Sequence, residues 1–139
     1  MKIFFSGPIR GGREDVHIYK KIIELLKNYG ELLNEFNADE NLEEREEKAK
    51  VSDEEIHAND VRLINECDIL VAEISTPSIG VGYEIGIAES LNKRILCLFR
   101  KSKGSRLSAM INGNERIVVF EYETIQDLKL KIKNFFKVN

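Results

Sequence analysis

The order of apolar segments along the chain constrains the fold more than any other feature of the sequence. Short apolar runs, typical of buried strands, alternate with longer segments in which apolar residues recur at helical spacing. The expected strands are residues 2–6, 31–36, 68–74, 94–99 and 117–121, and the expected helices are residues 14–29, 52–67, 81–91 and 124–137. This alternation predicts a parallel sheet covered on both faces, with ligands bound beyond the carboxyl ends of its strands.

Size and charge restrict the classes of function. The chain has 139 residues with a net charge of −3, which predicts one domain over residues 1–139 and gives no footprint for a nucleic acid polymer. No apolar run is long enough to span a membrane, and the chain opens directly on a strand, so we expect neither a membrane segment nor a signal peptide. Cys67 and Cys97 have neither metal-site nor redox-motif spacing, which favours reduced cysteines and a cytoplasmic location.

The loop after the first strand, residues 7–13, reads GPIRGGR. Two arginines among three glycines, between a strand and a helix, suggest a clamp for a phosphate or carboxylate, because backbone N–H groups and the helix dipole favour an anion there. Arg13 and Glu14 stand where a P-loop has Lys and Ser or Thr, so we do not expect ATP hydrolysis of that type. A flexible turn with solvated arginines is the alternative that this loop leaves open.

A second glycine-rich loop follows the strand at 68–74 and carries Gly80, Gly82 and Glu84. The glycines would let a ligand approach the backbone closely. We expect Glu84 in the first turn of the next helix, where the helix dipole favours the ionised carboxylate that a nucleophile requires. The plainer interpretation is that a glutamate in a first turn simply stabilises the helix.

The helix expected at 52–67 opens with a capping box, Ser52 followed by Glu55, and contains an anomaly. Its apolar face is set by Ile56, Leu63, Ile64 and Cys67, and Asp60 occupies an inward position on that face. An acidic side chain there lowers stability unless it is paired or used in function. A functional role and a structural salt bridge both remain open for Asp60. His57, one turn earlier, is expected at the solvent edge, and a hydrogen-bonding role that supports the site is the alternative.

Two charged tracts have plainer interpretations. Residues 38–50 hold six acidic and three basic residues, which indicates a solvated helix or loop. Residues 101–106 form a basic turn on the side of the sheet where a ligand is expected.

Taken together, these segments resemble the Rcl-type 2′-deoxynucleoside 5′-phosphate N-hydrolases of the nucleoside 2-deoxyribosyltransferase superfamily. The resemblance covers about residues 2–112, in matching order and spacing. The segments that carry it are KIFFSGPIRGGRED, IHANDVRLINECDILVAE, STPSIGVGYEIGIA, NKRILCLFR and LSAMING.

The resemblance implies a fold, a site and an assembly. The fold is a flavodoxin-like α/β three-layer sandwich with a five-stranded parallel sheet. Glu84 would attack the anomeric carbon, and Asp60 would assist the departing base. The implied substrate-binding residues are Phe4, Gly7, Ile9, Arg10, Gly11, Ser78, Gly80, Ser108 and Met110. Ser108 would reach the site from the partner in a homodimer, and neither a metal nor a cofactor is implied.

Two positions depart from the family pattern. Pro8 replaces a serine, which removes one hydroxyl and one backbone N–H from the expected phosphate cradle. Phe4 replaces a tyrosine near the sugar, and related ribonucleotide hydrolases carry phenylalanine there, so the preference for deoxyribose over ribose stays open.

The expected reaction is hydrolysis of the N-glycosidic bond of a nucleoside 5′-monophosphate to free base and a (deoxy)ribose 5-phosphate. A nucleoside 2-deoxyribosyltransferase is the alternative enzyme. Transferases of the superfamily tend to have an acidic residue at the position of Ser78, and an acid there would repel a phosphate. A non-catalytic nucleotide-binding sensor is the third hypothesis, although the acidic residues of receiver domains are missing after the first strand.

Overall fold

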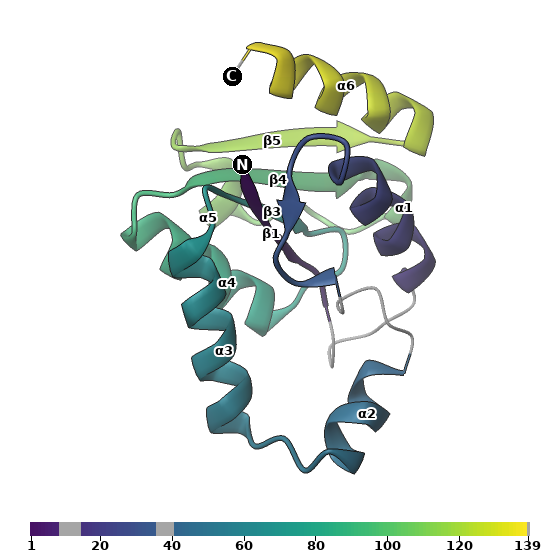
Figure 1. The fold of residues 1–139 in the computed structure, drawn as a ribbon. Coiled ribbons are helices and arrows are strands. Elements are labelled where there is room, and N and C mark those ends of the chain that lie inside the picture. The colour runs from purple at the N-terminus through teal and green to yellow at the C-terminus, as the bar shows by residue number, and fades with distance from the viewer. Residues whose placement is uncertain (9–14, 36–40, 139) are drawn as a thin grey trace.

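The computed structural model describes residues 1–8, 15–35 and 41–138 and shows a three-layer α/β sandwich around one parallel sheet (Figure 1). The strands are β1 (Lys2–Ser6), β2 (Glu31–Leu32), β3 (Ile69–Glu73), β4 (Arg94–Arg100) and β5 (Ile117–Tyr122). They pair in the order β2-β1-β3-β4-β5, and every pair is parallel. The expected five-stranded parallel sheet is therefore confirmed.

The helices cover both faces of this sheet. They are α1 (Val16–Leu26), α2 (Leu42–Lys48), α3 (Asp53–Glu66), α4 (Ile79–Ser90), α5 (Ala109–Asn112) and α6 (Ile125–Val138), with a 3-10 turn, η2, at Lys101–Lys103. None of the described helices is long and apolar enough to cross a membrane.

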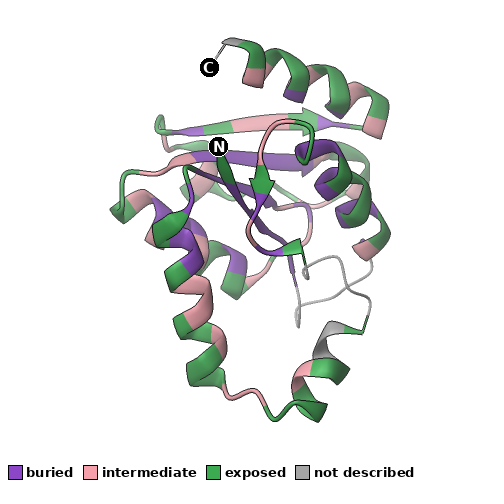
Figure 2. Ribbon diagram, in the orientation of Figure 1, coloured by how far each residue is buried: buried purple, intermediate pink, exposed green. Residues whose placement is uncertain are grey.

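The core is divided by the sheet into two clusters, because successive strand residues point to opposite faces. On one face, Ile3, Phe5 and Val71 pack with residues of α1 and α6. On the other, Phe4 and Leu70 pack with residues of α3 and α4. The buried positions therefore run along the strands between the two helical layers (Figure 2).

The strand expected at 31–36 is much shorter in the structure. β2 contributes two residues, and the side chain of Asn34 then takes over the pairing with β1. Asn34 Oδ1 accepts from the Phe5 N–H at 2.8 Å, and its Nδ2 donates to the Phe5 carbonyl at 2.5 Å. A buried side-chain amide thus satisfies the backbone N–H and carbonyl of Phe5 near the end of β1, next to the carboxyl edge of the sheet.

Two helix starts place residues that the sequence had singled out. Ser52 caps α3 by accepting the Glu55 N–H at 3.1 Å, as the capping box predicts. Ser78 caps α4 by accepting the Val81 N–H at 3.3 Å, so α4 begins at Ile79, earlier than expected.

Gly30, between α1 and β2, gives a test of how closely the backbone packs at this connection. A methyl group at this position would meet the Met1 carbonyl oxygen at 2.4 Å, which is backbone and cannot move aside cheaply. We expect Gly30→Ala to lower the free energy of unfolding by about 1–3 kcal/mol in urea denaturation. The matched control is Gly86→Ala in α4, where an added methyl meets nothing within 4 Å. That variant should be unchanged or more stable by up to about 1 kcal/mol; equal destabilisation of both would contradict the steric argument.

Candidate active site

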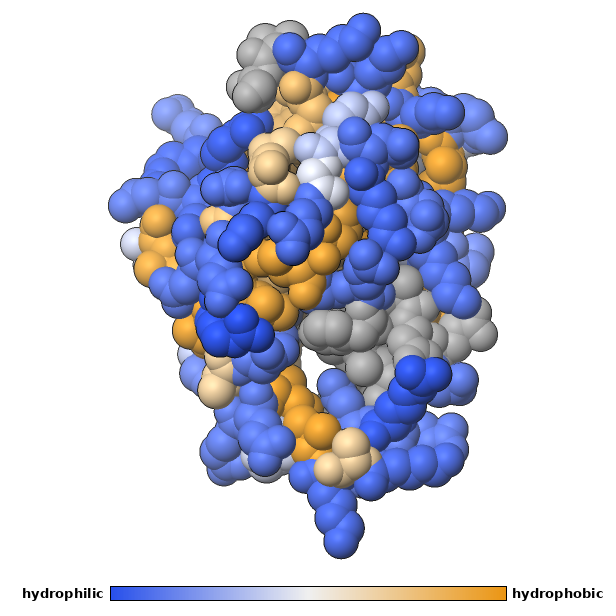
Figure 3. All heavy atoms as spheres, in the orientation of Figure 1, coloured by the Kyte–Doolittle hydropathy of each residue, from blue (hydrophilic) through white to orange (hydrophobic). Residues whose placement is uncertain are grey.

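A cavity of about 610 Å³ opens at the carboxyl edge of the sheet, on the face covered by α3 and α4. Five of the residues expected in the site line it, namely Gly7, Asp60, Ser78, Gly80 and Glu84. Its remaining lining residues are Glu46, Asp53, Ile56, His57, Pro77, Ile79 and Val81. Figure 3 shows a hollow on this side of the molecule, between α2 and α3, with apolar side chains along it.

Glu84 enters the cavity from α4. Because α4 begins at Ile79, Glu84 lies in its second turn rather than in the first, where the helix dipole acts most strongly. Burial, followed by the negative charge of Asp60, raises the pKa of Glu84 to about 8, and the Ser6 hydroxyl acts in the opposite direction. The structure therefore differs from the expectation of a carboxylate kept ionised by the helix, since burial outweighs the dipole.

Asp60 reaches the same cavity from α3, where it is half-buried on the face that otherwise packs against the core. Burial and the nearby charge of Glu46 raise the pKa of Asp60 to about 6, and His57 lowers it. No ion pair involving Asp60 is found among the described residues, so the structural salt bridge that the sequence left open is not formed there.

The two carboxyl groups form an interacting pair, so their protons leave in two steps that belong to the pair. Between roughly pH 6 and pH 8, the pair holds about one proton. Within the described part of the chain, Ser6 Oγ and Glu84 Oε2 are buried and have no well-formed hydrogen bond. Glu84 lines the cavity, so its Oε2, left without a partner there, is available to a ligand.

The amino end of α4 forms a second functional element of the cavity. The Val81 and Gly82 N–H groups bond to Ser78, which leaves the N–H groups of Ile79 and Gly80 without a partner inside the helix. A methyl group at Gly80 would meet only Ser78 Oγ, at 3.9 Å, so the approach to this backbone is open. A helix start of this kind favours an anion.

Ser108 and Met110 do not line this cavity. Ser108 caps the short helix α5, and both residues line a second cavity of about 460 Å³. The two cavities adjoin, because Pro77, Ser78, Ile79 and Val81 line both. The structure therefore does not bring Ser108 and Met110 to Glu84 within one chain.

Phe4 is fully buried in the core on the α3 and α4 face and does not line the cavity. An unsubstituted phenyl ring has no polar group to direct toward a ligand, and it packs here as a core residue. Ser6, two positions further along β1 on the same face, is the strand residue that acts on Glu84. Ile9, Arg10 and Gly11 lie outside the described residues.

The sequence patterns did not assign Ser6, Glu46 or His57 to the site, and they placed His57 at the solvent edge. Ser6 is the last residue of β1 and shares a face with Phe4, two residues earlier, so the alternation along the strand could have pointed to Ser6. His57 lines the cavity, and its Nε2 lies 3.3 Å from the Tyr83 hydroxyl, which links α3 to α4. Glu46 comes from the acidic tract that was interpreted as solvated, where no residue stands out from its neighbours. Among the described residues, no cluster of three or more His, Cys, Asp or Glu is arranged to hold a metal ion.

Comparison with known proteins finds relatives over nearly the whole chain. Mouse 5-hydroxymethyl-dUMP N-hydrolase is 43% identical over 138 residues, which cover 97% of this chain and 79% of that protein. A putative 2′-deoxynucleoside 5′-phosphate N-hydrolase 1 of Nematostella vectensis is 45% identical over 138 residues, covering 97% of this chain and 93% of that one. The solved CMP N-glycosidase BcmB of Clostridium botulinum shares the fold, with a TM-score of 0.68 at 18% identity over 97% of this chain and 99% of that one.

The family model described as nucleoside 2-deoxyribosyltransferase matches residues 3–128, a span that includes both carboxylates and the amino end of α4. With relatives above 40% identity over nearly the whole chain, this protein belongs to the nucleoside 2-deoxyribosyltransferase family.

Proposed function

We propose that this protein hydrolyses the N-glycosidic bond of 2′-deoxynucleoside 5′-monophosphates, with Glu84 as the nucleophile. The observation that carries the proposal is the placement of two interacting carboxyl groups, Asp60 and Glu84, in one cavity beside an open helix start. The reaction class also rests on the relatives at 43% and 45% identity, whose names describe N-hydrolases of nucleoside 5′-phosphates. The chain is accordingly a hydrolase.

The mechanism follows from the single proton that the pair holds near neutral pH. The pKa values place this proton mostly on Glu84, and the reactive form is the one in which it has passed to Asp60. In that form, an oxygen of Glu84 forms a bond to the anomeric carbon while the bond to the base breaks. The bonding electrons leave with the base, which takes the proton from Asp60. Water then attacks the same carbon, its proton passes to Asp60, and the ester bond to Glu84 breaks. The products are the free base and deoxyribose 5-phosphate.

The 5′-phosphate fits the amino end of α4. The free N–H groups of Ile79 and Gly80 and the hydroxyl of Ser78 stand at one end of the cavity that contains Glu84. Arg10 stays the predicted cation of this subsite. We expect nucleoside monophosphates to react about 100-fold better than nucleosides, since the phosphate gains charge-assisted hydrogen bonds of roughly 1.5–3 kcal/mol each.

The transferase alternative differs only in the acceptor, which is a second base instead of water. Ser78 argues against it, because an acid at that place would repel the phosphate, and a serine that caps a helix can donate to it instead. The sensor alternative predicts binding without turnover, so product analysis separates all three hypotheses.

The proposal is tested by Glu84→Gln, which keeps the size of the side chain and removes the nucleophilic carboxylate. We expect kcat for base release from a deoxynucleoside monophosphate to fall on the order of 10³-fold or more, with the melting temperature preserved or raised. Glu89→Gln on the same helix is the matched control, because Glu89 contacts Asn114 and does not line the cavity. Turnover of Glu84→Gln within a few-fold of wild type contradicts the assignment, and base exchange without net release favours the transferase.

The pH dependence of kcat/KM provides an independent test. Activity should rise as pH passes about 6, where the pair loses its first proton, and decline above about 8, where Glu84 and Asp60 are both ionised and the base cannot be protonated. Because a substrate phosphate also titrates near pH 6, the alkaline limb is the diagnostic one. In Asp60→Asn the charge that raises the pKa of Glu84 is gone, so the ionisation of Glu84 should move to lower pH. An unchanged profile in Asp60→Asn would contradict coupling between the two groups.

We further propose a homodimer in which Ser108 of each protomer completes the site of its partner. Ser108 lines the cavity that adjoins the one with Glu84. Three large apolar side chains on α4 and α5 are exposed: Ile79, which lines both cavities, at 95%, Met110, which lines the second, at 82%, and Tyr83 at 57%. Such a patch is typical of an interface, and a two-fold axis would bring it onto itself. A cytoplasmic location stays a prediction, in keeping with two cysteines that are buried and unpaired.

The shared site predicts complementation between two inactive variants. Glu84→Gln and Ser108→Trp, mixed under conditions that allow subunit exchange, should regain up to about a quarter of wild-type activity, since half of the dimers would carry one intact site of two. Met110→Glu should give monomers by ultracentrifugation and lose activity, and Leu130→Glu, at a residue 61% exposed on α6, should remain an active dimer. A fully active wild-type monomer, or no recovery on mixing, contradicts the shared site.

A further inference from the structure

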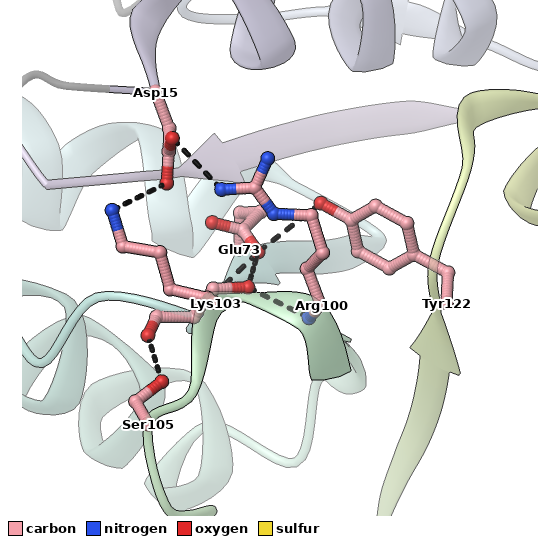
Figure 4. Close-up of polar contacts among 7 residues, drawn as sticks. Asp15, Glu73, Arg100, Lys103, Ser105 and Tyr122 are labelled. Carbon is pink, nitrogen blue, oxygen red and sulfur yellow. Dashed lines mark hydrogen bonds and ion pairs between the residues drawn. The ribbon is translucent and has the colours of Figure 1, made fainter.

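A second polar cluster lies at the carboxyl edge of the sheet, on the face opposite to the catalytic cavity. Glu73, Arg100 and Tyr122 are the last residues of β3, β4 and β5 (Figure 4). Arg100 is paired with Tyr122, and it lies two residues beyond Leu98, the partner of Glu73, so the three side chains share one face of the parallel sheet. Glu73 is 1% exposed and Tyr122 is 2% exposed. We call Glu73, Ser75, Arg100, Tyr122 and Asp15, with Lys103 and Ser105 at its margin, the edge network.

Hydrogen bonds in the edge network converge on Glu73 and Ser75. The Tyr122 hydroxyl donates to Glu73 Oε1 at 3.3 Å, and Ser75 donates to the same oxygen through its hydroxyl and its N–H. Ser75 Oγ in turn accepts from the Arg100 N–H at 2.7 Å. The Ser105 hydroxyl donates to the Ser75 carbonyl. The segments that follow β3 and β4 are thereby joined at Ser75.

The start of α1 is joined to the same cluster through Asp15. Arg100 Nη2 lies 2.8 Å from Asp15 Oδ1, and Lys103 Nζ lies 3.4 Å from Asp15 Oδ2. The Asp15 side chain is only 8% exposed, and that of Arg100 is 18% exposed, so this ion pair is largely shielded from water. Loss of one partner of such a pair leaves an uncompensated charge, which is strongly unfavourable.

None of these residues lines the cavity of Asp60 and Glu84, yet several stand in the chain segments that lead to residues of the site. Ser75 stands three residues before Ser78, and Ser105 three residues before Ser108. Lys103, which pairs with Asp15, stands in that second segment, five residues before Ser108.

We propose that the edge network positions the phosphate-binding groups of the active site without touching the substrate. This positioning role rests on the proposed function, because it requires that these groups bind a 5′-phosphate.

The chemistry of the network favours positioning over stabilisation alone. A buried carboxyl group is costly, and Glu73 Oε2 and Arg100 Nε have no hydrogen-bond partner among the described residues. Apolar side chains of similar volume at such a place are often equally or more stabilising. What directed hydrogen bonds and ion pairs add is a fixed geometry of the three chain segments that leave this edge.

The test uses two variants at opposite ends of the network, Asp15→Asn and Ser75→Ala, and reads out selectivity for phosphate. For each, kcat and KM are measured with a deoxynucleoside 5′-monophosphate and with the matching deoxynucleoside. We expect KM for the monophosphate to rise about 10-fold or more with kcat changed less than about 3-fold. The ratio of kcat/KM between nucleotide and nucleoside should fall about 10-fold. Asp15→Glu, which keeps the charge, should recover part of the ratio.

The matched control is Glu24→Gln, which breaks an exposed Lys27–Glu24 pair of the same 2.8 Å length on α1. Its kinetics should equal those of wild type. A lower melting temperature with an unchanged selectivity ratio in both network variants means that the cluster is only structural and overturns the proposal. If wild type itself shows no preference for the monophosphate, the phosphate assignment fails, and the positioning role fails with it. Wild-type preference with unchanged variants overturns the positioning role alone.

Discussion

All five strands end at the same edge of the sheet, because every neighbouring pair is parallel, and the rest of the structure depends on this constraint. The polar ends of β1, β3, β4 and β5 are brought together there although their residues are far apart in sequence. The backbone N–H and C=O groups at such an edge cannot all be paired between neighbouring strands. Loops and helix starts must therefore supply their hydrogen-bond partners. Asn34, Ser75 and Ser78 do so with side chains that bond to the backbone.

The two faces of that edge carry different chemistry. On the α3 and α4 face, Asp60 and Glu84 stand in an open cavity with raised pKa values. On the α1 and α6 face, Glu73 and Arg100 lie in a closed network in which most polar atoms have protein partners. The alternation of side chains along each strand keeps the two sets apart, so one set remains available to a ligand.

Electrostatics in the cavity follow from burial more than from the helix dipole. Glu84 lies too far along α4 to benefit from its amino end, and the neighbouring Asp60 disfavours a second negative charge. The N–H groups of Ile79 and Gly80 have no partner inside the helix, so the same helix offers an anion site at its start and a carboxyl group with a raised pKa one turn later. This separation suits a substrate that carries a phosphate at one end and a bond to be broken at the other.

The sequence by itself determined the parallel sheet and the helices α1, α3, α4 and α6, and it singled out Asp60 and Glu84 as candidates, because apolar periodicity and capping act over a few residues. The capping box at Ser52 and the inward position of Asp60 are local patterns of this kind, and both were readable without a structure. Only the tertiary structure decided that burial and Asp60 raise the pKa of Glu84, that Phe4 is core and that Ser6 acts on the Glu84 carboxyl group. The ion pair between Asp15 and Arg100 is likewise seen only in the tertiary structure. These properties depend on the distance between groups far apart along the chain and on their removal from water, neither of which a local pattern encodes.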